Sequence, residues 1–206
     1  MEVNNEGPLL RDSMNADPFR QFLQWFQEAE QAGMPLPNAM NLATSTQAGR
    51  PSVRMVLLKG VDDRGLIFHT NYQSRKGQEI KENPFAAIVF YWSALARQVR
   101  IEGKVEKLDP AESEAYFASR PRGSQIGAHA SPQSQVVADR DALVAIYQAA
   151  EKKFSGKSVP RPENWGGYRL VPQIFEFWQE GANRIHDRLR YRRDEAGDWV
   201  LERLAP

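Results

Sequence analysis

Three side chains near the middle of the sequence could together bind a phosphate monoester. Tyr116 and Arg120 are four residues apart, so on a helix they share one face, and Ser124 can follow in the turn. A phenol, a guanidinium and a hydroxyl that converge suit a monophosphate dianion, because hydrogen bonds from charged donors to phosphate are short and strong. The alternative interpretation is a helix end at which Arg120 satisfies the last carbonyl groups.

A second candidate anion site begins at Ser74. Ser74, Arg75 and Lys76 stand at a predicted helix start and follow Thr70. The amides of a helix N-terminus carry partial positive charge and unpaired donors, so a hydroxyl and two cations added there make a phosphate cradle. The alternative is an ordinary N-cap with solvated basic neighbours.

Two further basic groups lie on predicted strands. Arg54 and Lys59 bracket one strand and should point to opposite faces unless a bend re-aims one of them, and they could equally be edge charges. If the segment 184–188 is extended, Arg184, His186 and Arg188 project from one face. Like charges this close disfavour one another, so the second pattern favours an anionic ligand over a solvated face.

Composition excludes several kinds of chemistry. The sequence has no cysteine, which excludes disulfides, thiolate metal sites and cysteine nucleophiles. His69, His129 and His186 lack the spacing of a zinc site, so no metal is expected. There is no G-x-S-x-G nucleophile elbow, no P-loop and no glycine-rich dinucleotide fingerprint.

Charge and hydropathy predict the protein's surroundings. With 27 basic and 26 acidic residues the net charge is +1, which gives no general attraction to nucleic acid or membranes. No apolar run approaches the ~18 residues of a membrane span, and the N-terminus lacks the basic and apolar regions of a secretory signal. We therefore expect a cytoplasmic protein with no nucleic-acid or membrane partner.

Helices and strands must alternate to position these side chains. Helices are predicted at 18–33, 74–82, 109–117 and 139–154, and strands at 39–46, 52–59, 66–70, 85–92, 97–108, 168–170, 174–179, 184–192 and 199–204. This mixture predicts an α+β barrel rather than a doubly wound parallel sheet. Since domains usually have ~100–200 residues, we expect residues 1–16 to form a flexible arm and residues 17–206 a single domain.

Taken in order, the basic clusters resemble the pyridoxamine 5′-phosphate oxidase family. The resemblance covers residues 18–206 without a break. The matching strings are RMVLLKG at 54–60, SRK at 74–76, RQVRIEG at 97–103, YFASRPRGSQIGAHAS at 116–131, FWQEG at 177–181, RIHDRLRY at 184–191 and RLAP at 203–206.

The resemblance implies a fold and a set of site residues. The fold would be an FMN-binding split β-barrel with flanking helices, forming a homodimer with FMN in a cleft between the subunits. Substrate phosphate would meet Lys59, Tyr116, Arg120 and Ser124, while Arg184 and His186 would be catalytic over the pyridine ring. The FMN contacts would be Arg54, Met55, Val56, Leu57, Leu58, Lys59, His69, Thr70, Arg75, Lys76, Gln98, Gln133, Ser134, Trp178 and Arg188.

The resemblance also implies an activity. Pyridoxamine 5′-phosphate and pyridoxine 5′-phosphate would be oxidised by molecular oxygen to pyridoxal 5′-phosphate, with hydrogen peroxide and, from the amine, ammonia, in vitamin B6 biosynthesis and salvage. Two other functions stay open: a split-barrel flavin reductase or electron-transfer protein, and a non-catalytic module that binds pyridoxal phosphate or flavin. The phosphate set around Arg120 argues against the reductase.

Two positions depart from the family pattern. The family commonly has an arginine followed three residues later by tyrosine in its N-terminal arm, whereas Arg11 is followed by Met14. It usually has an acidic residue where Leu36 precedes Pro37 here. Both changes concern the substrate side. His69 also stands where the family often has tyrosine.

Overall fold

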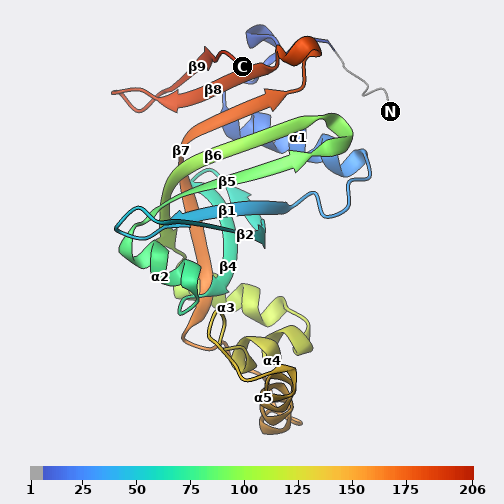
Figure 1. Cartoon of the computed structure of the whole chain (residues 1–206), viewed down its shortest axis with the longest axis vertical. Coiled ribbons are helices and arrows are strands. Elements are labelled where there is room, and N and C mark those ends of the chain that lie inside the picture. Colours follow the sequence, from blue (N-terminus) through green and yellow to red (C-terminus); the bar gives the residue numbers. More distant parts are fainter. Residues whose placement is uncertain (1–6) are drawn as a thin grey trace.

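One antiparallel sheet of nine strands organises the part of the chain that the structure, a computed structural model, describes: residues 7–206 (Figure 1). The order is β2-β1-β5-β6-β7-β4-β3, with β8 on the far half of β7 and β9 on β8. The strands are β1 (Ala39–Ser45), β2 (Pro51–Leu57), β3 (Gly60–Asp62), β4 (Gly65–Asn71), β5 (Phe85–Trp92), β6 (Arg97–Lys107), β7 (Trp165–Gln179), β8 (Asp187–Arg193) and β9 (Trp199–Arg203).

The long strand β7 curls this sheet. Its first part pairs with β4 from Trp165 to Leu170, and its last part pairs with β8 from Ile174 to Gln179. Between them the register with β6 shifts at Glu102/Gly103, a bulge that bends a strand. Gly103 is needed there because a Cβ atom would lie 2.0 Å from the carbonyl oxygen of Val171. The result is the expected α+β half-barrel rather than a parallel sheet.

Five α-helices flank the sheet, and four of them begin at a capping residue that the sequence indicates. Asp17, Ser74, Asp109 and Asp139 each accept a hydrogen bond from a backbone amide of the first turn. Among residues 7–206, no helix is both long and apolar enough to cross a bilayer. The helices are α1 (Pro18–Gln31), α2 (Arg75–Glu82), α3 (Pro110–Ser119), α4 (Arg122–Ala130) and α5 (Arg140–Lys153).

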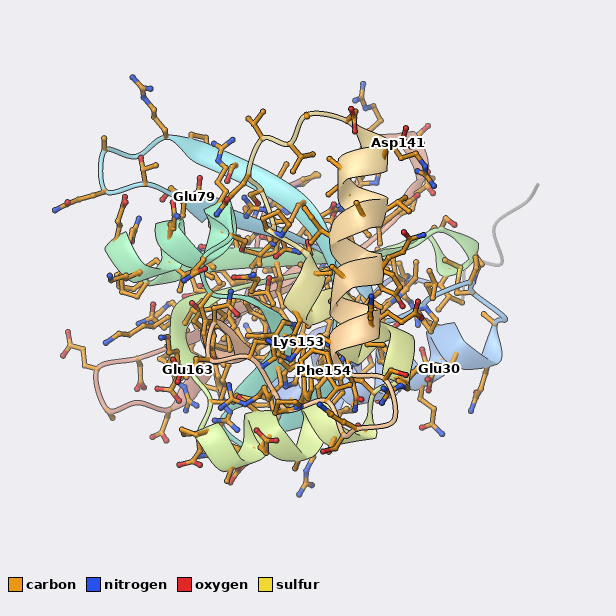
Figure 2. The ribbon with its side chains drawn as sticks, turned by 90° about the horizontal axis from the view of Figure 1, so that it is seen from below. Glu30, Glu79, Asp141, Lys153, Phe154 and Glu163 are labelled. Atoms are coloured by element: carbon orange, nitrogen blue, oxygen red, sulfur yellow. The ribbon has the colours of Figure 1, made fainter. Side chains whose placement is uncertain are left out.

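Two hydrophobic clusters hold the molecule together. The larger one lies inside the sheet under α1. There Phe22 packs on Phe90 and Trp92, while Trp25 packs edge-on against Phe177. The smaller one joins α3, α4 and the segment after α5 to the start of β7 through Phe117, Ile126, Phe154, Val159 and Trp165. Figure 2 shows α5 from Asp141 to Lys153, with Phe154 at the end that meets this small cluster.

Several local expectations need correction. Residues 122–130 form a helix, α4, that the glycine-containing sequence did not indicate, and the strands predicted at 168–170 and 174–179 are one continuous strand, β7. The segment 184–192 is not extended throughout. Arg184 ends a short 3₁₀ turn, Ala182–Arg184, and β8 begins only at Asp187, so Arg184, His186 and Arg188 do not share a strand face.

The N-terminal arm also differs from expectation where the structure describes it. Leu9 is buried, its amide donates to the Asp187 carboxylate at 3.0 Å, and Tyr191 donates to the carbonyl of Asn15 at 2.6 Å. Residues 7–16 are therefore fastened to β8, because their backbone groups find partners on the C-terminal strands. Residues 1–6 of the predicted flexible arm lie outside the described residues.

Candidate active site

A cavity of about 430 Å³ lies between β2, β4 and the helices α2, α3 and α4. Its size suits a small-molecule ligand. Its lining contains the cations Lys59, Lys76 and Arg120 but no aspartate or glutamate. The lining residues are Met55, Val56, Leu57, Lys59, His69, Thr70, Asn71, Lys76, Tyr116, Arg120, Ser124, Gly127, Ala128, Ser131, Gln133 and Trp165.

Lys76 is a buried cation at one side of this cavity. Its ammonium lies 3.2 Å from the Thr70 hydroxyl, 3.4 Å from the Ser74 hydroxyl and 3.3 Å from the Gln133 amide oxygen, all of them neutral acceptors. Burial lowers the pKa of Lys76, and nearby Arg54 lowers it further, while Glu79 opposes them. A buried ammonium that is surrounded by neutral oxygens is poorly compensated, so an anion bound in the cavity would be stabilised there.

Arg120 is a second cation without an acidic partner. Its guanidinium lies over the Trp165 ring, 4.5 Å from the ring centroid, and its buried Nη1 has no hydrogen-bond partner among the described residues. Burial lowers the pKa of Arg120, with Tyr116 acting in the opposite direction. Tyr116 on α3 and Ser124 on α4 line the same cavity. The structure therefore brings together the three residues that the sequence predicted to bind a phosphate, although Ser124 lies in a helix and not in a turn.

His69 forms an aromatic stack at the cavity wall. Its ring lies 3.9 Å from the Tyr116 ring and 5.3 Å from the Trp165 ring, nearly parallel to both. Burial, followed by the charges of Arg120 and Lys59, lowers the pKa of His69 to about 4. The imidazole is therefore neutral at neutral pH, and both of its buried ring nitrogens lack a partner among the described residues.

Arg54 and Arg75 share one buried carboxylate outside the cavity lining. Glu79 on α2, labelled in Figure 2, lies 3.2 Å from Arg54 and 2.8 Å from Arg75 and also accepts hydrogen bonds from Thr44 and Ser52. Burial by itself would raise the pKa of Glu79, but these hydrogen bonds lower it to about 2. Arg54 and Lys59 diverge as alternation along a strand predicted, with Lys59 at the cavity and Arg54 on Glu79.

Some of the remaining residues predicted to contact the flavin line the cavity, and others do not. Met55, Val56, Leu57, Thr70 and Gln133 line it, and the Thr70 hydroxyl donates to Gln133 at 3.1 Å. Leu58 is buried in the large hydrophobic cluster and is absent from the cavity lining. Ser134 follows Gln133 with a left-handed φ of 70° and is exposed.

A second group of predicted site residues lies at the other end of the sheet. Gln98 pairs with Trp178, Trp178 pairs with Arg188, and the His186 ring lies 4.9 Å from the Trp178 ring. Trp178 is thirteen residues beyond Trp165 on β7, which is roughly 40 Å of strand path at ~3.3 Å per residue. Figure 1 shows the same separation, with β8 and β9 at one end and α3, α4 and α5 at the other.

A buried carboxylate, that of Glu176, holds two arginine side chains in this distant group. Glu176 on β7 lies 2.8 Å from Arg188 and 2.8 Å from Arg100. The hydrogen bond to Glu176 raises the pKa of Arg188. Arg184 is exposed in the turn before β8. One chain by itself does not bring Gln98, Trp178, Arg184, His186 and Arg188 to the cavity.

Sequence reasoning missed several residues of the site. Trp165 supports Arg120, and Asn71, Gly127, Ala128 and Ser131 complete the lining. Glu79 had a local signal, because it follows Arg75 by four residues on a helix, a spacing that allows an ion pair. Trp165 gave no such signal, since it lies 45 residues beyond Arg120 in the chain. Within residues 7–206 no group of three or more histidine, aspartate or glutamate side chains could hold a metal ion.

Comparisons with known proteins agree with these features. Residues 26–153 match the family described as pyridoxamine 5′-phosphate oxidase, and residues 165–206 match the pyridoxine 5′-phosphate oxidase C-terminal dimerisation region. A pyridoxine/pyridoxamine 5′-phosphate oxidase of Acaryochloris marina is 56% identical over 198 residues, which cover 96% of this chain and 90% of the relative.

Solved structures show the same fold. PhzG from Burkholderia lata, in complex with tetrahydrophenazine-1-carboxylic acid, is 36% identical with a TM-score of 0.90, covering 96% of this chain and 98% of that one. A pyridoxamine 5′-phosphate oxidase-related, FMN-binding protein from Nostoc punctiforme is 19% identical with a TM-score of 0.71, covering 94% of this chain and 100% of that one. The second likeness concerns the fold alone.

Proposed function

Because this chain belongs to the pyridoxamine 5′-phosphate oxidase family of FMN-dependent oxidoreductases, we propose that it oxidises pyridoxamine 5′-phosphate and pyridoxine 5′-phosphate to pyridoxal 5′-phosphate. Oxygen is the electron acceptor and hydrogen peroxide the by-product, with ammonia released from the amine substrate. The observation that carries this proposal is a cavity with three cations and no carboxylate in its lining.

The cavity residues fit FMN, the cofactor of this family. A phosphate monoester placed beside Lys76 would compensate the buried ammonium that has only neutral acceptors around it. Thr70 and Gln133 supply further polar groups, and Met55, Val56 and Leu57 offer backbone and apolar surface for a ring system. Arg54 and Arg75, both held by Glu79, would contribute positive potential next to this set.

A second phosphate, that of the substrate, fits the opposite part of the cavity. Lys59, Tyr116, Arg120 and Ser124 line it, and in the described residues Lys59 and Arg120 make no ion pair with a carboxylate. The Arg120 guanidinium rests on Trp165, which orients it without neutralising its charge. A dianion would therefore find two free cations, whereas an unphosphorylated vitamer would leave both uncompensated.

The complete site requires two copies of the chain. The outer face of β2, β1 and β5 exposes Val53 (66%), Met55 (58%), Phe85 (53%) and Tyr91 (57%), an apolar face that is unusual for a free surface. Met55 belongs to both this face and the cavity lining. A second subunit that covers the face would bring its own Trp178, Arg184, His186 and Arg188 to the cavity, in a homodimer of the kind that the matched dimerisation region describes.

The catalytic work then divides between cofactor and protein. Bound FMN supplies two-electron redox chemistry, with electrons from the substrate and oxygen as their final acceptor. Arg120 and Lys59 bind and orient the substrate through its phosphate. Arg184 and His186 contact the pyridine ring, with His186 at the phenolic oxygen and Arg184 at the substituent that is oxidised. Glu176 holds the Arg188 guanidinium in place through an ion pair at 2.8 Å.

An oxygen-electrode assay tests this function directly. Purified protein loaded with FMN is mixed with pyridoxamine 5′-phosphate, and pyridoxal 5′-phosphate is followed in parallel through its aldehyde. We expect equal amounts of oxygen consumed and aldehyde formed, and much weaker turnover of unphosphorylated pyridoxamine. A yellow protein that consumes no oxygen with either phosphorylated vitamer would contradict the proposal and favour a flavin reductase. Binding of pyridoxal phosphate without turnover would favour a storage module.

A further inference from the structure

The turn between β7 and β8 has an unusual backbone. Asn183 adopts φ 54° and ψ 28°, and Arg184 follows with φ 65°. Residues other than glycine rarely enter this left-handed region, and two in succession store strain that the surrounding structure has to hold. Asparagine tolerates the region better than most residues because its short side chain can hydrogen-bond locally.

Gly181 is required at the start of this turn by a close approach, not by its φ angle. Its φ of −121° and ψ of 156° are ordinary extended values. A Cβ atom at this position, however, would lie 1.9 Å from the carbonyl oxygen of Ile185. The backbone of residue 185 is thus folded back onto residue 181, and any side chain at residue 181 would have to displace it.

Both ends of the turn are fastened to the rest of the molecule. The Glu180 amide donates to the carbonyl of Ala96 at 3.0 Å, and the Asp187 carboxylate accepts from the Leu9 amide at 3.0 Å. Within the turn, the Ile185 amide donates to the carbonyl of Ala182 at 3.0 Å. These bonds prevent the strained residues from relaxing, so the turn is held in one conformation.

The folded-back turn also fixes the histidine that follows it. The Gly181 amide donates to Nδ1 of His186 at 3.2 Å, and the ring lies against Trp178. A ring nitrogen that accepts a hydrogen bond carries no proton, so the proton of the neutral ring is on Nε2. Nε2–H is then the group that His186 can offer to a ligand.

We propose that Gly181 and Asn183 are positioning residues that hold His186 as its Nε2–H tautomer, with the ring acting as a hydrogen-bond donor. The assignment rests on the proposed function in one respect, namely that His186 contacts the substrate. A donor at Nε2 suits an electron-rich oxygen such as the phenolic oxygen of the pyridine ring. A ring that presents its proton at Nε2 cannot accept a proton there, so His186 is not the general base of the oxidation.

Nitrogen NMR of the holoenzyme tests the tautomer independently of activity. The sequence contains only His69, His129 and His186, so protein labelled with ¹⁵N-histidine gives few signals, and a His186→Gln variant identifies those of His186. We expect an unprotonated Nδ1 and a protonated Nε2. A protonated Nδ1 in the neutral ring would overturn the proposal, whether or not the protein proves to be an oxidase.

A matched pair of variants tests the positioning role. Asn183→Gly removes the amide side chain but accepts the left-handed conformation, whereas the β-branched side chain of Asn183→Val opposes it. We expect Asn183→Gly to keep the wild-type tautomer signals and kcat. Asn183→Val should lose those signals and lower kcat about 100-fold, the effect of misplacing a catalytic group by ~1 Å. Bound FMN and the unfolding midpoint should stay close to wild type.

Gly181→Ala provides a second approach to the same turn. Its new methyl group should displace Ile185 and break the bond from the Gly181 amide to His186, so the tautomer signals and kcat should change together. Wild-type signals and turnover in both Asn183→Val and Gly181→Ala would overturn the proposal. Equal losses in Asn183→Gly and Asn183→Val would also overturn it, because the amide group and not the backbone conformation would then matter.

Discussion

At the scale of single residues, the site depends on which cations meet a carboxylate. Arg54 and Arg75 share an ion pair with Glu79, and Arg188 forms an ion pair with Glu176. Lys76 and Arg120 instead lie among neutral oxygens and aromatic rings. In the proposed site, this difference makes Lys76 and Arg120 anion-binding groups, because an uncompensated buried charge gains most from a bound counter-charge.

Arg120→Ala should weaken substrate binding and leave cofactor binding intact. Losing one partner of a buried charged contact costs about 2–5 kcal/mol, so KM for pyridoxamine 5′-phosphate should rise roughly 30- to several-thousand-fold. Steady-state kinetics and the flavin content of the purified variant measure the two effects. Arg122→Ala is the control, since Arg122 donates to the carbonyls of Lys157 and Phe154 and does not line the cavity. Equal kinetics in both variants would refute the phosphate role.

At the scale of elements, α2 is the structural centre of the cofactor side. Its N-cap Ser74 accepts from the Gly77 amide and lies beside Lys76, while one turn later Glu79 ties the helix to β1 and β2 through Thr44 and Ser52. The close approach of Gly77 to the backbone of Tyr72, where a Cβ would lie 2.3 Å from a carbonyl oxygen, sets the angle at which the helix starts. The helix thus joins the phosphate-binding groups to the sheet.

Glu79→Gln should destabilise the protein in a pH-dependent way. The pKa of Glu79 is lowered from 4.5 to about 2, and a change of this size corresponds to about 3 kcal/mol of stability. Because the folded-state pKa lies below the unfolded value, the contribution is complete above pH ~4.5 and is lost as the pH falls toward about 2. Denaturant unfolding at several pH values measures it.

We expect the wild type and Glu79→Gln to differ most near pH 7 and to converge in acid. Glu82→Gln on the same helix is the control, because Glu82 is exposed. A stability difference that stays constant from pH 7 to pH 3 would show that the carboxylate charge is not responsible.

At the scale of the whole molecule, the two groups of site residues are kept apart by the length and curl of β7. The cavity lies at the end with α2, α3 and α4, and Trp178, Arg184, His186 and Arg188 lie at the end with β8 and β9 (Figure 1). In the proposed homodimer the second subunit unites them, and the exposed apolar face of β2, β1 and β5 offers a surface for it.

Subunit mixing should restore activity between two variants that are nearly inactive at low substrate concentration. In the proposed homodimer, Arg120→Ala and His186→Ala each damage a different half of a site that two chains share. In a hybrid dimer, one site carries both substitutions and the other is intact. The two variants are co-expressed with different affinity tags. If they pair at random, the whole mixture of dimers should have about a quarter of wild-type activity. Hybrid dimers with no more activity than either parent would show that one chain supplies the whole site.

Most of the local structure can be predicted from the sequence. Helix caps and alternating apolar residues are signals that involve only residues close together in the chain. The structure has the caps at the expected residues, which are Asp17, Ser74, Asp109 and Asp139. It also indicated that Arg54 and Lys59 diverge, and that Tyr116, Arg120 and Ser124 converge, because these residues are close in the chain. The sequence strings that match the pyridoxamine 5′-phosphate oxidase family indicated the family and the site residues that it implies.

How these residues are combined depends on the folded chain as a whole. Three features depend on segments that are far apart in the sequence. They are the burial of Lys76 among neutral oxygens, the packing of His69 against Tyr116 and Trp165, and the strained turn before His186. The separation of Trp178 from the cavity depends on the change of partners along β7. No local pattern carries such information, because the energy of a buried charge or a close backbone approach is set by whatever the folded chain places around it.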